Sequence, residues 1–137
     1  MSGVEVGLVF GFGILVSGSL WAKPTWNTYW TWDPRLTSAA ITMLIYVAYL
    51  MLRSAVEDPN RRARFASVYG VFAFISVPIT YFSIRWWRTI HPVLDSSNPD
   101  AQGGFTTGPN IAMAFRYSML AFTVLAITLL IHRVRLE

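Results

Sequence analysis

The sequence predicts an all-α protein, a polytopic transmembrane helix bundle of about four spans with Trp-rich outer loops. Three observations support this fold class. Hydrophobic residues make up 54% of the 137 residues and charged residues 13%, against roughly 25% charged in typical soluble domains. Four long apolar stretches occur along the chain. All six tryptophans lie in or beside two of the segments that separate those stretches.

The apolar stretches predict spans at about residues 5–21, 36–53, 63–84 and 111–131 of a single membrane domain covering residues 1–137. A span needs about 20 apolar residues at a rise of about 1.5 Å each. The first stretch is rich in glycine and short at its start. A secretory signal is not expected there, because the residues before it include Glu5 and neither Lys nor Arg.

Local signals predict where the helices begin. Asp33-Pro34 is an N-cap followed by proline at the first helical position, which indicates the start of the second helix. Asp58-Pro59-Asn60 is a turn that separates the second span from the third. Pro109 opens the fourth span.

An even number of spans places both termini on one side of the membrane and the outer loops, 22–35 and 85–110, on the other. Six Lys and Arg residues fall on the terminus side, and four or five fall on the loop side, depending on Arg116. This small excess favours cytoplasmic termini and Trp-rich loops outside.

Several function classes are excluded by what the sequence lacks. It has no cysteine, which excludes a disulfide framework, a CxxCH haem attachment site and a CxxC thiol relay. It has no P-loop, so any ATP hydrolysis belongs to a partner chain. The net charge of +4 is not gathered on a basic face, and no nucleic-acid partner is expected. No protease or hydrolase motif is present, so the protein is not expected to be an enzyme.

All the tryptophans are expected on one side of the membrane. An interfacial aromatic belt would decorate both membrane faces, and that interpretation stays open as an alternative. A one-sided aromatic shelf instead suits a large planar apolar ligand, because ring faces stack on it and bury area at low entropic cost. Most of the rings lie in or beside the first loop: Trp21, Trp26, Tyr29, Trp30 and Trp32. Asp33 is the single acid among them, and a role as helix cap is at least as well supported as any chemical role.

The second loop begins with the run RWWRTIH at residues 85–91. If the third helix continues through it, Trp87 and His91 share a helix face and Arg88 adjoins both. Imidazole ligates haem iron and guanidinium pairs with propionates, so this run suits haem binding, with a solvated loop histidine as the alternative. The run contributes Arg85, Trp86, Trp87, Arg88 and His91 as candidates. His132 is expected at the opposite membrane face, where it cannot ligate the same iron.

The run WNTYWTWDPRLTS at residues 26–38 resembles the Trp-rich signature of the haem-handling membrane proteins of cytochrome c maturation. Within that superfamily, the RLTS that follows WDP resembles the heme exporter protein C family. The runs GSLWAKP at residues 18–24 and WWRTIH at residues 86–91 are similar to the same family, and RYS at residues 116–118 more loosely so.

This resemblance implies a haem-transfer subunit of a bacterial-type inner (plasma) membrane that holds haem b non-covalently at the outer face. It implies that the subunit passes haem to a periplasmic haem chaperone, together with the ATPase and membrane subunits of an ABC transporter. The Trp-rich loop would be the haem platform and His91 one axial ligand of the iron. The resemblance also implies that the Trp-rich loops lie outside and the termini in the cytoplasm.

The resemblance further implies six spans in a whole family member, with the second axial histidine in an early span that precedes the region present here. We therefore expect this chain to correspond to the C-terminal four-span portion, through a split gene, a mis-assigned start or a truncation. A separate chain would then supply the missing spans and histidine.

Two other interpretations stay open. A haem- or quinone-binding anchor subunit of a redox enzyme would need histidines inside its spans, and residues 7–131 contain none within a predicted span. The second open interpretation is a truncated remnant that no longer binds haem.

Overall fold

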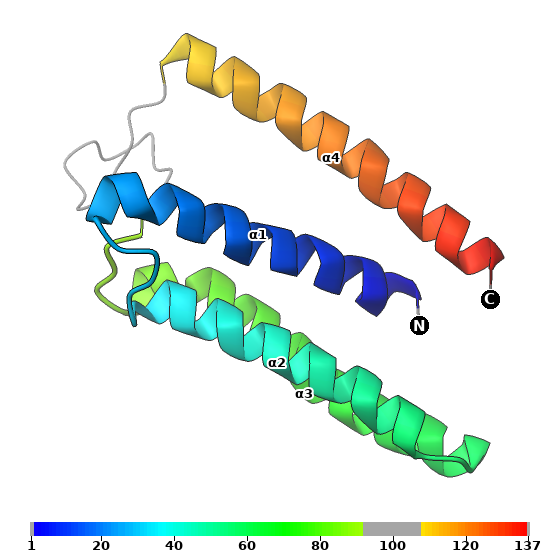
Figure 1. Ribbon diagram of the computed structural model, residues 1–137. Coiled ribbons are helices and arrows are strands. Elements are labelled where there is room, and N and C mark those ends of the chain that lie inside the picture. Colours follow the sequence, from blue (N-terminus) through cyan, green and yellow to red (C-terminus); the bar gives the residue numbers. More distant parts are fainter. Residues whose placement is uncertain (1, 92–107, 137) are drawn as a thin grey trace. The chain divides into compact units, whose positions relative to one another are not determined.

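The computed structural model describes residues 2–91 and 108–136, and within those residues it is built of α-helices with no strand (Figure 1). The helices are α1 (Ser2–Trp26), α2 (Pro34–Ala55), α3 (Pro59–Trp86) and α4 (Pro109–Arg135). The predicted all-α fold class is confirmed. Asp33 caps α2 and α4 begins at Pro109, as predicted. The turn predicted at Asp58-Pro59-Asn60 is instead the start of α3, with Asp58 as the N-cap and Pro59 at the first helical position.

All four helices are long and apolar enough to cross a membrane. They are also longer than the predicted spans, because each includes residues at its ends that the apolar stretches leave out, such as Arg61 on α3 and Arg133 on α4. The clearest case is α1, which continues through Pro24 to Trp26, so Trp21 and Trp26 both lie on a helix. The prediction had placed residues 22–26 in the first loop.

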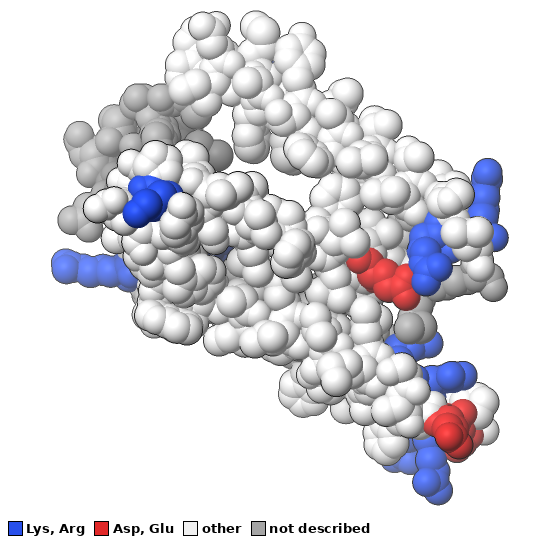
Figure 2. Space-filling model, in the orientation of Figure 1, with Lys and Arg blue, Asp and Glu red and all other residues white. Residues whose placement is uncertain are grey.

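The outer surface of the helices is apolar. Large hydrophobic side chains such as Ile14 on α1, Leu44 on α2 and Phe74 on α3 are more than 60% exposed. On the face drawn in Figure 2, the helix surfaces are almost free of charge, and Lys, Arg, Asp and Glu gather near helix ends. Lipid is the solvent that such a surface requires. The chain is a multi-pass membrane protein.

Helices α2 and α3 pack side by side and antiparallel (Figure 1). Small residues on α3 make this close approach possible, since Ala66, Ala73 and Ser83 are buried and a Cβ on Gly70 would touch the Tyr49 ring at 3.7 Å. Small interfacial residues are how membrane helices gain van der Waals contact where lipid removes the hydrophobic driving force. Helix α1 approaches α2 at Gly11, where the Met43 side chain fills the space a Cβ would need.

Polar bonds cross the α2–α3 interface near the start of α2. The hydroxyls of Thr42 and Thr80 lie 2.9 Å apart, and Thr42 also donates to the carbonyl of Ser76 at 3.4 Å. The Arg35 guanidinium donates to the carbonyl of Thr80 at 2.6 Å. Such interhelical bonds contribute on average about 0.6 kcal/mol each within a membrane.

The described chain divides into two compact units, one of residues Leu8–Thr89 and the other of Met1–Gly7 with Ile90–Glu137. The first unit holds the α2–α3 pair and most of α1. In the second, the Arg133 guanidinium donates to the carboxylate of Glu5. The single membrane domain stays a prediction.

Candidate functional site

The Trp-rich segment between α1 and α2 is held by its own hydrogen bonds. Asn27 ends α1 with a φ of 57°, a left-handed conformation that asparagine tolerates better than most residues. The Lys23 ammonium donates to the Asn27 carbonyl at 3.2 Å and lies 5.4 Å from the centre of the Tyr29 ring. The Thr28 hydroxyl donates to the Trp30 carbonyl at 3.0 Å. These contacts fix the backbone that presents the aromatic rings.

The rings at the end of α1 and in the segment that follows it form two edge-to-face pairs. Trp21 and Trp26 have centroids 5.5 Å apart at 84°, and Trp30 and Trp32 have centroids 6.0 Å apart at 85°. In each pair one ring is half-buried and supports an exposed one. Trp32 is 83% exposed and Tyr29 57% exposed. The segment therefore presents ring faces outward on a fixed base.

The C-terminal end of α3 adds further rings at the same end of the α2–α3 pair (Figure 1). Trp86 stacks on Phe82 with centroids 5.5 Å apart at 19°, and Trp87 meets Trp86 edge-to-face at 5.9 Å. Both tryptophans are exposed. We call the seven rings from the two segments the aromatic shelf: Trp21, Trp26, Tyr29, Trp30, Trp32, Trp86 and Trp87.

The helical continuation considered for residues 87–91 is wrong. Helix α3 ends at Trp86, and Trp87 is extended, with its N–H donating to the Ser83 carbonyl at 3.1 Å. Trp87 and His91 therefore do not share a helix face. A physical reason is visible in the sequence, because Thr89 and Ile90 are β-branched and Pro92 disfavours the helical conformation at His91.

Asp33 links the two segments that carry the shelf. Its carboxylate accepts the Arg35 backbone N–H at 2.9 Å, which confirms the predicted cap. The Thr89 hydroxyl also lies 2.7 Å from both carboxylate oxygens. Asp33 is only 7% exposed, and its carboxylate is engaged by Arg35 and Thr89.

Arg35 and Thr89 were missed as site residues by sequence reasoning. Their partners, Thr80 and Asp33, lie 45 and 56 positions away in the chain. A single sequence does not indicate which residues that are far apart in the chain form hydrogen bonds with each other. Thr89 does lie within the WWRTIH run, which was the one available hint.

The remaining predicted residues are placed as follows. Arg85 and Arg88 are exposed and form no hydrogen bond or ion pair with other described residues. His91 is half-buried in a bend after α3 and belongs to the unit that contains Ile90–Glu137, whereas the aromatic shelf belongs to Leu8–Thr89. His132 lies in the last turn of α4. Within the described ranges, no three His, Cys, Asp or Glu side chains come together to hold a metal ion.

This end of the α2–α3 pair thus offers exposed aromatic faces and exposed guanidinium groups. Ring faces accept a flat conjugated molecule, and guanidinium groups pair with carboxylates. The described side chains therefore fit a planar, largely apolar ligand that carries anionic substituents.

The chain is similar to known proteins along nearly its whole length. The sequence profile described as heme exporter protein C matches residues 2–137. Heme exporter protein C of Bradyrhizobium diazoefficiens is 39% identical over 132 residues, 96% of this chain and 49% of the relative. That of Escherichia coli strain K12 is 35% identical over 130 residues, 95% of this chain and 51% of the relative.

A ccmC-like mitochondrial protein of Marchantia polymorpha, named for cytochrome c biosynthesis, is 35% identical over 109 residues, 80% of this chain and 42% of the relative. The chain therefore spans about half the length of the curated relatives it matches.

Proposed function

This chain belongs to the heme exporter protein C family, and we propose that it binds haem b non-covalently on the aromatic shelf during cytochrome c maturation. Haem is the cargo in this proposal, and the protein acts as a transfer and assembly subunit and not as an enzyme. The observation that carries the proposal is the set of exposed rings held at one end of two membrane helices.

The shelf supports a porphyrin for a physical reason. Trp32, Trp86 and Trp87 are more than half exposed, although large aromatic side chains usually bury most of their area. A planar porphyrin covering them would remove that area from water. The half-buried Trp30 holds the Trp32 ring edge-to-face, so little conformational freedom is lost when a ligand stacks.

The charged residues of the second segment suit the polar edge of haem. Arg85 and Arg88 flank the two adjacent tryptophans and are exposed, and we propose that they pair with the haem propionates. We propose His91 as one axial ligand, two residues after Thr89. The second axial ligand would come from elsewhere, in keeping with the half-length match to the relatives.

We further propose that the shelf end faces the outside of a bacterial-type inner membrane, with the termini in the cytoplasm. Haem would then pass to a periplasmic haem chaperone, and the chain would work with the ATPase and membrane subunits of an ABC transporter. The relatives' name as exporters and the excess of positive charge on the terminus side support this arrangement.

A haem titration of the full chain in detergent tests the shelf. The double variant Trp30→Ala, Trp32→Ala should bind haem at least about tenfold more weakly, since each aromatic pair contributes ~0.5–1.5 kcal/mol beyond area burial. The double variant Phe72→Ala, Phe74→Ala, at two rings each 67% exposed elsewhere on α3, should bind like the wild type. Unchanged haem affinity in the tryptophan variant would favour an interfacial aromatic belt. A wild-type chain that binds no haem would favour the interpretation as a truncated remnant.

A further inference from the structure

The end of the α2–α3 pair opposite the aromatic shelf carries an open cavity of about 370 Å³. It lies between the last turns of α2 and the first turns of α3. We call it the basic pocket, and the side chains that matter for its chemistry are Tyr49, Arg53, Arg62, Ala63, Ala66 and Ser67.

Arg53 has unused hydrogen-bonding capacity in this pocket. Its Nη1 donates to the Tyr49 hydroxyl at 3.3 Å. Its Nε is buried and has no hydrogen-bond partner among the described residues. Buried polar groups in proteins are almost always paired, so an unpaired guanidinium N–H beside an open cavity indicates an acceptor that enters the cavity.

Arg62 supplies a second guanidinium from the other helix. It is half-buried, and its side chain forms no hydrogen bond or ion pair within the described ranges. No acidic residue lines the basic pocket. Two like charges that share a pocket favour an anion between them.

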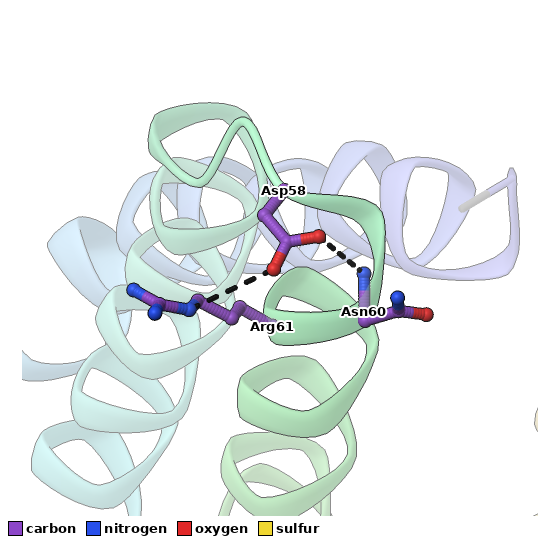
Figure 3. Close-up of polar contacts among 3 residues, drawn as sticks. All are labelled: Asp58, Asn60 and Arg61. Atoms are coloured by element: carbon purple, nitrogen blue, oxygen red, sulfur yellow. Dashed lines mark hydrogen bonds and ion pairs between the residues drawn. The ribbon is translucent and has the colours of Figure 1, made fainter.

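The acid that caps α3 is already occupied. The Asp58 carboxylate accepts the Asn60 backbone N–H at 3.1 Å and pairs with the Arg61 Nε at 3.7 Å (Figure 3). The Arg61 side chain is 78% exposed and does not line the pocket. Asp58 thus caps α3 and pairs with Arg61, and no ion pair among the described residues compensates the charge of Arg53 or Arg62.

The pocket's chemistry matches a phosphate group. The planar guanidinium fork suits phosphate oxygens, and the Tyr49 hydroxyl can add a further donor, whereas the Ser67 hydroxyl donates to the Arg64 carbonyl at 2.9 Å. The methyl groups of Ala63 and Ala66 give the pocket an apolar wall. It lies at the end of two helices long enough to cross a membrane, which is the depth of lipid headgroups. We infer that the basic pocket binds the phosphate of an anionic membrane phospholipid.

Lipid retention measured by native mass spectrometry tests this inference on the full chain. The probes are phosphatidylglycerol, phosphatidylcholine and inorganic phosphate. The double variant Arg53→Gln, Arg62→Gln should bind phosphatidylglycerol at least about tenfold more weakly than the wild type. The matched double variant Arg61→Gln, Arg64→Gln removes the same charge outside the pocket and should change binding less than about twofold.

Arg53→Lys keeps the charge but loses the planar fork, and it should fall between the wild type and the double variant. Helix content from circular dichroism shows that each variant is folded. Equal losses in the two double variants would overturn the inference in favour of non-specific loop charge. The inference would also be overturned if phosphatidylglycerol and phosphatidylcholine were both retained equally well with and without the pocket arginines. If the chain binds inorganic phosphate but not phosphatidylglycerol, the bound phosphate group does not come from a lipid. If it binds none of the three probes, the inference is overturned in favour of an acidic segment of a partner protein.

Discussion

The hydroxyl of Thr89 lies 2.7 Å from each carboxylate oxygen of Asp33, a residue 56 positions earlier in the chain. Because Asp33 also caps α2, one buried carboxylate serves the start of α2 and the segment that follows α3. The two Trp-bearing segments are therefore joined at their bases by a side-chain bond, in addition to helix packing.

Removing the Thr89 hydroxyl should weaken both the protein and its proposed ligand binding. Hydrogen bonds to charged groups contribute about 1.5–3 kcal/mol, so Thr89→Val should lower the free energy of unfolding by that order. Haem affinity should fall as well, since the segment after α3 loses one of the contacts that hold it. Thermal unfolding and haem titration of the full chain in detergent measure the two effects. Thr89→Ser keeps the hydroxyl and is the matched control, and wild-type values for the valine variant would show that the bond is unimportant.

The proposed ligation by His91 has a spectroscopic signature. One imidazole from this chain leaves the other axial position of the iron open to water or an added ligand. Haem bound to the full chain should look five-coordinate or high-spin, and added imidazole should convert it to a six-coordinate low-spin form. Absorption and resonance Raman spectra distinguish the two forms.

The two histidines provide a matched pair of variants for this experiment. His91→Ala should abolish the protein ligation, whereas His132→Ala, in the last turn of α4, should leave the spectrum unchanged. A six-coordinate two-histidine spectrum from the unmodified chain alone would contradict the assignment of a single axial ligand.

The proposed orientation predicts opposite labelling of two engineered cysteines. Asn60→Cys, in the first turn of α3, should be protected from an impermeant thiol reagent applied outside intact cells. Ser96→Cys lies in the predicted outer loop, outside the residues that the structure describes, and should react. The natural chain has no cysteine, so the background is clean. Reaction at both positions from the outside would rule out four spans with cytoplasmic termini.

The tight packing of α2 on α3 predicts a site-specific loss of stability. Ala73 is 0% exposed at the interface, and overpacking such a site costs about 1–3 kcal/mol. Ala73→Leu should therefore lower the unfolding free energy measured by denaturant titration in detergent. Val71→Leu, at a residue 61% exposed on the same helix, should change it by less than about 0.5 kcal/mol. A similar loss of unfolding free energy in the two variants would mean that the effect comes from helix propensity and not from steric crowding in the α2–α3 interface.

The fold was predictable because its determinants are local. Apolar run length identifies a membrane helix, and Asp33-Pro34 marks the start of α2 by short-range capping that the structure confirms. Asp58-Pro59 carries the same local pattern at the start of α3, although it was predicted as a turn. The end of α1 was less predictable, since continuation through Pro24 depends on local contacts that composition does not report.

The aromatic content of the candidate site was predictable from the sequence. The hydrogen bonds that connect its segments were not. The rings were evident because six tryptophans occupy two short stretches. The bonds of Arg35 to Thr80 and of Thr89 to Asp33 join distant positions, and residue type alone does not reveal them. The helical relation between Trp87 and His91 was wrong because the end of a helix depends on weak preferences of a few residues.

The short connection between α2 and α3 has a consequence for how the protein assembles. Only residues 56–58 separate the two helices, so closing them into a hairpin costs little loop entropy. The small residues of α3 then allow the pair to form from near-neighbour segments, before any later part of the chain is needed. Because the hairpin brings the beginning of α2 next to the end of α3, the base of the aromatic shelf can be complete early in biosynthesis.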